Sequence, residues 1–235
     1  MNGYLDTLLL NVTGGEKQDL ISTDKNTIYQ ITTTENQNNK EYNNISTVNL
    51  GDCEERLKNI YGIDKNLSLI IFKIDYYVEG LLIPIIAYEI YNPKNKSLLN
   101  LTYCEDILVK LNIPVSINEK NLFKYDPNSE YYTDECHAYT TENGTDILLD
   151  DRKIEYLDNN YSLCETNCTF SGYDENSKKA MCECETKTKI GLITDIINNE
   201  DILSNEFNTD NSASNVIIIK TTYLTHSMRE PNFTI

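Results

Sequence analysis

The segment CETNCTFSGYDENSKKAMCEC, residues 164–184, decides how this part of the chain folds, and together with Cys136 it holds five of the seven cysteines. Its cysteines form two close groups, spaced C-x3-C and C-x-C, and the residues between them are mostly polar. So polar a segment stays folded because disulfides restrict its unfolded ensemble, each typically contributing about 2–4 kcal/mol. The pattern predicts a disulfide-stapled module, in which Thr169 to Cys184 form a hairpin that turns at Asp174-Glu175-Asn176.

All seven cysteines are therefore predicted disulfide residues: Cys53, Cys104, Cys136, Cys164, Cys168, Cys182 and Cys184. The odd total leaves one of them unpaired, and the sequence alone does not decide which one or how the others pair. Cys53 and Cys104 are the two outside the cluster, at the edges of one predicted β domain. We expect them to pair with each other.

Two other chemistries use the same residue types. Four thiolates from the C-x3-C and C-x-C groups can bind zinc, but the single-residue spacing is tight for a zinc knuckle. Cys136-His137 can begin a metal site or a Cys–His nucleophile, and the plainer alternative is a disulfide cysteine beside an incidental histidine. His226 is the only other histidine, and neither a zinc-protease motif nor a serine-hydrolase elbow is present. We predict no metal site and no catalytic residues.

The chain of 235 residues carries a formal charge of −17. That charge repels phosphate backbones and disfavours docking on an anionic membrane, so we expect no nucleic-acid partner. No run approaches the roughly 20 apolar residues of a membrane span. The N-terminus lacks the basic and apolar regions of a signal peptide, so we expect the chain to be a mature form or part of a longer precursor.

N-glycosylation sequons are frequent, and N-linked glycans are expected partners. With the cysteines, they favour an extracellular or cell-surface location, because disulfides persist in oxidising compartments. The predicted glycosylation sites are Asn11, Asn44, Asn66, Asn95, Asn100, Asn143, Asn160, Asn167 and Asn232.

The fold class is mainly β with short helices. We predict a β-sandwich-like domain at 19–120 and a small, disulfide-rich, EGF-like domain at 121–187. An N-terminal arm at 1–18 and a segment at 188–235 flank them. β-Branched and apolar runs predict strands at 27–34, Leu67–Val78, Leu81–Tyr91, Leu98–Tyr103 and, as an edge strand, Ile113–Ile117. Strand-forming runs also occur at Leu8–Leu10 and Val216–Ile219.

Two helices are predicted inside these domains. The first begins at Asp52 as N-cap, places Cys53, Leu57 and Ile60 on one face, and ends at Gly62. The second follows Asp150-Asp151, with Leu149, Ile154, Leu157 and Tyr161 as its apolar face.

Calcium and aromatic recognition are further alternatives. The segment Asp126 to His137 is not an EF-hand, because Tyr131 and His137 stand where that loop needs Gly and Glu. A looser calcium site there, or at Asp146, Asp150 and Asp151, is the alternative to simple turn and cap roles. Tyr76-Tyr77 and Tyr131-Tyr132 are either a binding face or ordinary half-buried residues.

Residues 27–187 resemble a module of large, cysteine-rich surface proteins of unicellular eukaryotes. The resemblance implies an extracellular, EGF-like and non-catalytic module, with a further cysteine on the strand after residue 215. This chain has Thr221 and Thr222 there, which puts one disulfide in doubt. The matching segments are Leu82-Ile83-Pro84-Ile85, Tyr125-Asp126-Pro127 to Cys136, Thr141 to Asp146, and Cys164 through Cys184.

Together these observations predict a non-enzymatic, glycosylated structural protein that binds itself to form a fibril or surface coat. No cofactor is expected. The alternative is an adhesin-type module that binds carbohydrate or protein.

Overall fold

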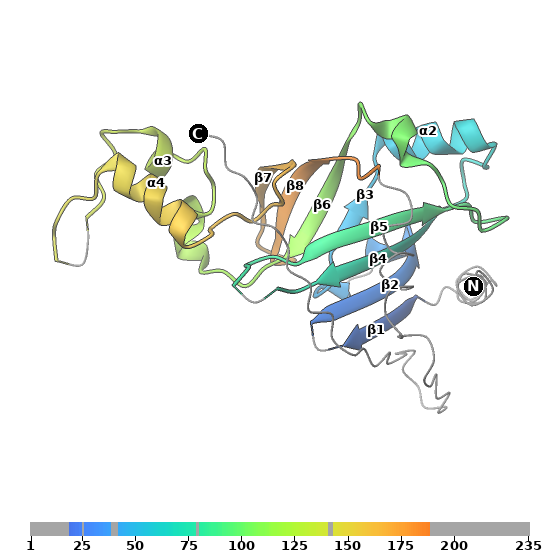
Figure 1. Ribbon diagram of the computed structural model, residues 1–235, viewed down its shortest axis with the longest axis horizontal. Coiled ribbons are helices and arrows are strands. Elements are labelled where there is room, and N and C mark those ends of the chain that lie inside the picture. Colours follow the sequence, from blue (N-terminus) through green and yellow to red (C-terminus); the bar gives the residue numbers. More distant parts are fainter. Residues whose placement is uncertain (1–18, 25, 39–41, 79, 141–142, 189–235) are drawn as a thin grey trace.

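The computed structural model describes residues 19–24, 26–38, 42–78, 80–140 and 143–188 (Figure 1). The predicted runs at Leu8–Leu10 and Val216–Ile219 lie outside these ranges. The elements in chain order are β1 (Leu20–Asp24), β2 (Thr27–Thr33), η1 (Asn36–Asn38), β3 (Thr47–Asn49), α2 (Asp52–Tyr61), β4 (Ile70–Tyr76), β5 (Ile85–Tyr91), η3 (Leu101–Cys104), β6 (Leu108–Pro114), η4 (Glu119–Lys124), α3 (Glu130–Thr133), α4 (Leu149–Asp158), β7 (Cys168–Asp174) and β8 (Lys179–Glu185).

Two antiparallel sheets form the body of the molecule, and they confirm the mainly β fold class. Sheet A has the order β1-β2-β4-β5, and sheet B has the order β3-β6-β8-β7. The central strand β4 reads IIFKIDY and is buried at every position except Tyr76. A strand covered on both faces needs apolar residues on both, which explains the apolar run Ile70-Ile71-Phe72, although two charged residues, Lys73 and Asp75, follow on its core face.

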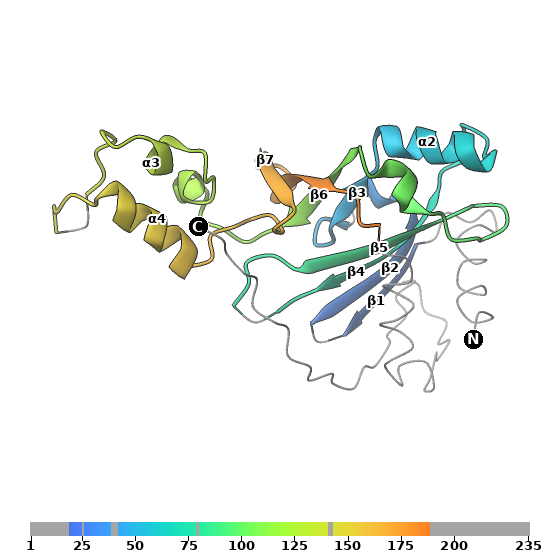
Figure 2. The same cartoon turned by 45° about the horizontal axis from the view of Figure 1, so that its top comes forward.

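The sheets pack face to face, with the main core between them (Figure 2). Sheet A contributes Ile71 and Ile90, sheet B contributes Val109 and Leu111, and α2 contributes Leu57, all of them buried. The physical basis is the burial of the apolar face of each sheet against the other.

Sheet B joins residues from both sides of the domain boundary expected at residue 120. Strand β6, before the boundary, pairs along its whole length with β8, from Leu108 opposite Glu185 to Pro114 opposite Lys179. Strand β8 in turn pairs with β7. The division must therefore be corrected: the cysteine-rich hairpin belongs to the sandwich and shares its core.

Two strand predictions are also wrong in detail. Only Leu98 of the predicted strand Leu98–Tyr103 makes a β-bridge, with Tyr91, and the chain then enters η3. Of the predicted edge strand Ile113–Ile117, only Ile113 and Pro114 are in a strand: they end β6, which lies between β3 and β8 and is not an edge strand. Pro114 is tolerated because it is the last residue of that strand.

Helix α2 confirms the first predicted helix. Gly62 ends it in the left-handed conformation, at φ 63°, which glycine adopts without steric cost. Cys53 and Leu57 are fully buried, whereas Ile60 is 47% exposed and does not belong to the packed face. The N-cap is Gly51 rather than Asp52, and no side chain caps the helix.

A helical insert, residues 118–162, separates β6 from β7 and holds η4, α3 and α4 at one end of the molecule (Figure 1). Helix α4 confirms the second predicted helix. Its predicted apolar face is wrong, because Ile154 is 54% and Leu157 62% exposed. The one buried residue of α4 is Arg152.

Candidate functional site

Three disulfides tie the sandwich together. Cys53 pairs with Cys104, as expected, and joins α2 to η3 with an Sγ–Sγ distance of 1.99 Å. The other two pairs are Cys164–Cys182 and Cys168–Cys184. The four cysteines that offered a zinc site are therefore bonded to each other in two disulfides.

The C-x-C spacing on β8 explains why both of these bonds face the core. Residues two apart in a strand point to the same face, and Cys182 and Cys184 are both buried in the main core. Cys168 lies directly opposite Cys184 across the hairpin, with a Cα–Cα distance of 4.0 Å. The two bonds thus close the hairpin on itself and on Cys164 just before it, and the backbone pairing of β8 with β6 attaches it to the sandwich.

Cys136 is the unpaired cysteine, and it is exposed. Its prediction as a disulfide residue is corrected, because the other six cysteines pair among themselves. We expect native, monomeric protein to take up one alkyl label per chain without reductant, since only this thiol is free. Mass spectrometry of the intact chain measures the count, and seven labels after denaturation and reduction are the control. Three or more labels on the native protein would contradict the three pairings.

Seven of the nine sequon asparagines lie in described parts of the chain, and Asn11 and Asn232 lie outside them. Asn100 is half-buried, and its side chain accepts a hydrogen bond from the Thr102 amide at the start of η3. A glycan there would compete with this cap. The exposed ones are Asn44, Asn66, Asn95, Asn143, Asn160 and Asn167.

Tyrosines form the core of the helical insert. Tyr131 and Tyr132 are buried and pack edge to face at 4.7 Å, and Tyr131 also contacts Phe123 and Tyr139. These two tyrosines are therefore not available as a binding face. Tyr76, by contrast, is 39% exposed at the end of β4.

Arg152 joins α4 to the end of α3. Its guanidinium lies 5.3 Å from the Tyr131 ring centroid and donates to the backbone carbonyls of Tyr131 (2.7 Å) and Asp134 (3.3 Å). Cationic side chains satisfy the last carbonyls of a helix in this way. No described carboxylate forms an ion pair with Arg152, so these carbonyls and the ring carry its stabilisation.

Glu155 lies beside this cluster, between two donors. Its carboxylate accepts hydrogen bonds from Lys124 Nζ at 2.7 Å and from Tyr131 Oη at 2.8 Å. Burial alone would raise the pKa of Glu155, but these hydrogen bonds outweigh it and the pKa is lowered. Burial and the neighbouring Glu155 raise the pKa of Tyr131. The carboxylate is thus held charged and the phenol neutral.

A second polar cluster lies inside the sandwich, on the core face of sheet A. Ser46 donates its backbone N–H (2.7 Å) and its hydroxyl (2.6 Å) to the Asp75 carboxylate. Lys73 Nζ donates to the hydroxyl of Ser46 (3.1 Å) and to its carbonyl oxygen. Burial lowers the pKa of Lys73 to about 8, although Asp75 opposes this shift.

A serine beside a lysine of lowered pKa is the arrangement of an activated nucleophile. All three side chains of this cluster are, however, almost wholly inaccessible to solvent. A substrate would have to enter the closed core to reach the Ser46 hydroxyl. The geometry therefore supports a structural role. The sequence analysis did not predict this cluster. The pattern that could have indicated it is the pair Lys73 and Asp75, two charged residues two positions apart in an otherwise apolar strand.

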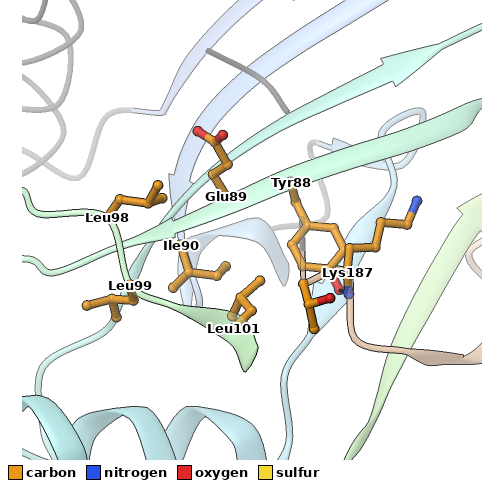
Figure 3. Close-up of a pocket in the computed structure, with 8 residues that line it drawn as sticks. Tyr88, Glu89, Ile90, Leu98, Leu99, Leu101 and Lys187 are labelled. Atoms are coloured by element: carbon orange, nitrogen blue, oxygen red, sulfur yellow. Dashed lines mark hydrogen bonds between the residues drawn. The ribbon is translucent and has the colours of Figure 1, made fainter. Parts of the chain in front are cut away.

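The pocket in Figure 3 lies at the free edge of β5 and is small, with a cavity volume of about 10 Å³. Pockets that bind small molecules usually measure about 300–1,000 Å³. Its cation, Lys187, is already engaged: its Nζ donates to the Ile86 carbonyl and lies 2.6 Å from the Glu165 carboxylate. Glu165 also accepts the Ile86 N–H at 2.8 Å. This Glu165–Lys187 pair covers part of the β5 edge.

Metal-binding geometry is absent from the described part of the chain: no three His, Cys, Asp or Glu side chains there come together. The Asp126 carboxylate instead accepts the Asn128 amide at 2.9 Å, as a turn residue does. His137 Nδ1 lies 4.0 Å from the Glu130 carboxylate. His226 lies outside the ranges described.

Within the same ranges, no helix is long and apolar enough to cross a membrane. Comparisons with models of protein families, with curated proteins and with solved structures found no match.

Proposed function

We propose that this chain is a non-enzymatic structural protein of the extracellular space or cell surface, N-glycosylated and self-associating. The observation that carries the proposal is that six of its seven cysteines form three disulfides in and around one sandwich core. Disulfides of this kind persist in oxidising compartments and are rare in the cytosol. The resemblance to cysteine-rich surface proteins of unicellular eukaryotes points to the same setting.

The exposure of six sequon asparagines supports the secretory part of this proposal, because the glycosylation machinery needs an accessible surface. We expect glycan on Asn143 and Asn167 in protein from the native source. Asn143 precedes Gly144 in an exposed turn, and Asn167 precedes β7 between two cysteines. Glycopeptide mass spectrometry gives the occupancy, with the half-buried site Asn100, whose side chain is engaged at the start of η3, as the internal comparison. Both sites bare would contradict the secretory assignment.

Self-association is proposed to occur by β-augmentation, in which a strand of one copy pairs with the sheet edge of another. The strand-forming runs Leu8–Leu10 and Val216–Ile219 are the donors. On the acceptor side, the β5 edge is partly covered by the Glu165–Lys187 pair, and β3 is only three residues long. Strand β7 offers a seven-residue edge of sheet B. Repeated head to tail, such a contact gives a filament.

Deleting residues 214–235, or residues 1–15, is expected to leave a disulfide-bonded monomer where the full chain assembles. The physical reason is the loss of the donor strand while the three disulfides remain. Negative-stain imaging and sedimentation at matched concentrations measure the outcome. A point variant, Ile218→Lys, serves as the control that keeps the chain length. Assembly by both truncated chains would overturn the proposed contact.

The alternative, an adhesin that binds a protein partner, is favoured by the surface of α4. Ile154 and Leu157 lie one turn apart on it and are both mostly exposed, so they form a small contiguous apolar patch on which a protein partner can dock. The double variant Ile154→Lys, Leu157→Lys should abolish adhesion to cells without changing assembly. Binding on a glycan array instead would identify a carbohydrate ligand.

A further inference from the structure

Sheet A has an outer face, turned away from sheet B, that is apolar and buried. Paired residues of adjacent strands share a face, and the register places Tyr29 beside Ile74 and Ile31 beside Phe72. Ala87 lies beside Ile74 on the next strand. The side chains of this face that are 6% exposed or less are Tyr29, Ile31, Ile70, Phe72, Ile74, Ala87, Glu89 and Tyr91.

The described elements do not account for this burial. The main core contains Ile71, Ile86 and Ile90, which point to the other face of sheet A. Sheet B and α2 both lie on that same side (Figure 2). A nearly inaccessible apolar face requires a covering layer, and within the described ranges neither sheet B nor α2 supplies it.

The described chain ends at the edge of β5, where the two faces of sheet A meet. The Lys187 amide donates to Oη of Tyr88, a core-face residue, at 3.4 Å (Figure 3). Thr188 lines the same pocket as Glu89, which belongs to the outer face. The next ten residues, 189–198, read KIGLITDIIN. At 100° per residue the five apolar side chains fall within an arc of about 160°, with Lys189, the first residue, inside it. Gly191, Thr194, Asp195 and Asn198 fill the opposite arc, as in an amphipathic helix. The apolar set is Ile190, Leu192, Ile193, Ile196 and Ile197.

We propose that residues 189–198 dock on the outer face of sheet A as an amphipathic helix, giving the sandwich a third layer. Ten helical residues span about 15 Å. The three strand spacings across sheet A span about 14 Å, so the helix fits the width of the sheet. The docked helix buries both the outer face of sheet A and its own apolar arc. A second copy of the chain on this face would leave the apolar arc of residues 189–198 exposed. Its direct connection to Thr188 also gives it a high effective concentration there.

The test uses the full chain with Cys136→Ser and a reporter thiol, Ala87→Cys, on the outer face. Labelling by a maleimide should be slow in this protein and equally slow with Thr194→Glu, on the polar arc. Ile193→Glu, on the apolar arc, should accelerate labelling many-fold. Equal rates for the two glutamate variants would overturn the proposal. So would acceleration by Leu9→Glu alone, which would assign the cover to residues 1–18, or loss of protection on dilution, which would assign it to a second copy.

A second readout does not depend on the new thiol. The chain contains no tryptophan, so a single introduced indole reports on its own surroundings. The emission of Ile193→Trp should be blue-shifted and several-fold less quenched by acrylamide than that of Thr194→Trp. Solvent-like emission from both would contradict docking. Both measurements are made on monomeric protein, so their outcome is independent of whether the chain forms filaments.

Discussion

Replacing Asp75 with alanine is expected to lower the free energy of unfolding by about 3–5 kcal/mol, the usual result of removing one partner of a buried ion pair. The Asp75 carboxylate is fully buried and accepts both the amide and the hydroxyl of Ser46. It also lies 3.9 Å from Lys73 Nζ. Without this carboxylate, the ammonium group of Lys73 is left in the core without its counter-charge, and the amide of Ser46 is left without a hydrogen-bond acceptor. Urea unfolding measures the loss.

The matched control is Asp106→Ala, which breaks the surface ion pair with Arg56. Its effect should be close to nil, because water screens exposed pairs. Equal effects of the two variants would contradict a structural role for the buried cluster.

The pH dependence of stability gives a second readout of the same cluster. Folding lowers the pKa of Lys73 from 10.5 to about 8, so between these values the unfolded chain binds more protons. Stability from this group therefore rises with pH in that window, by about 2 kcal/mol up to pH 9.5. Lys73→Met should remove the rise.

Removing the Cys53–Cys104 disulfide, by changing both residues to alanine, is expected to lower the free energy of unfolding by about 4 kcal/mol on the chain-entropy model. The two residues are 51 positions apart, the widest separation of the three disulfides. Their bond therefore removes the most freedom from the unfolded chain. It also fixes α2 against η3, where both sulfurs are buried.

The internal comparison is the Cys168–Cys184 pair, with a separation of 16. Its removal should cost about 3 kcal/mol on the same model, and it leaves a hairpin that is still held by its hydrogen bonds. Thermal and urea unfolding of both double variants give the ranking. A larger loss for the hairpin disulfide would show that native packing around the bond, rather than loop closure, dominates its contribution.

Features that depend on neighbouring residues in the chain could be predicted from the sequence of this protein. The β-branched and apolar runs of β2, β4 and β5 predicted strands because such residues suit a pleated, buried backbone. Gly62 predicted the end of α2, since the left-handed conformation favours glycine. The pairing of Cys53 with Cys104 followed from their isolation. The mainly β class and the hairpin at Thr169 to Cys184 could likewise be predicted from local sequence patterns.

The tertiary structure decided what depends on distant partners. The pairing of β6 with β8, across the expected boundary at residue 120, is a long-range register that no local pattern encodes. Helix α4 is a second example, because helical spacing predicted that Ile154 would be buried, whereas the structure buries Arg152. Arg152 can be buried because its guanidinium donates to a backbone carbonyl of α3 and lies over the ring of Tyr131. Lys73 and Asp75 could enter the core only because Ser46, far away in the chain, supplies their hydrogen bonds. A polar group can be buried only where its partners are, and their position is a property of the assembled fold.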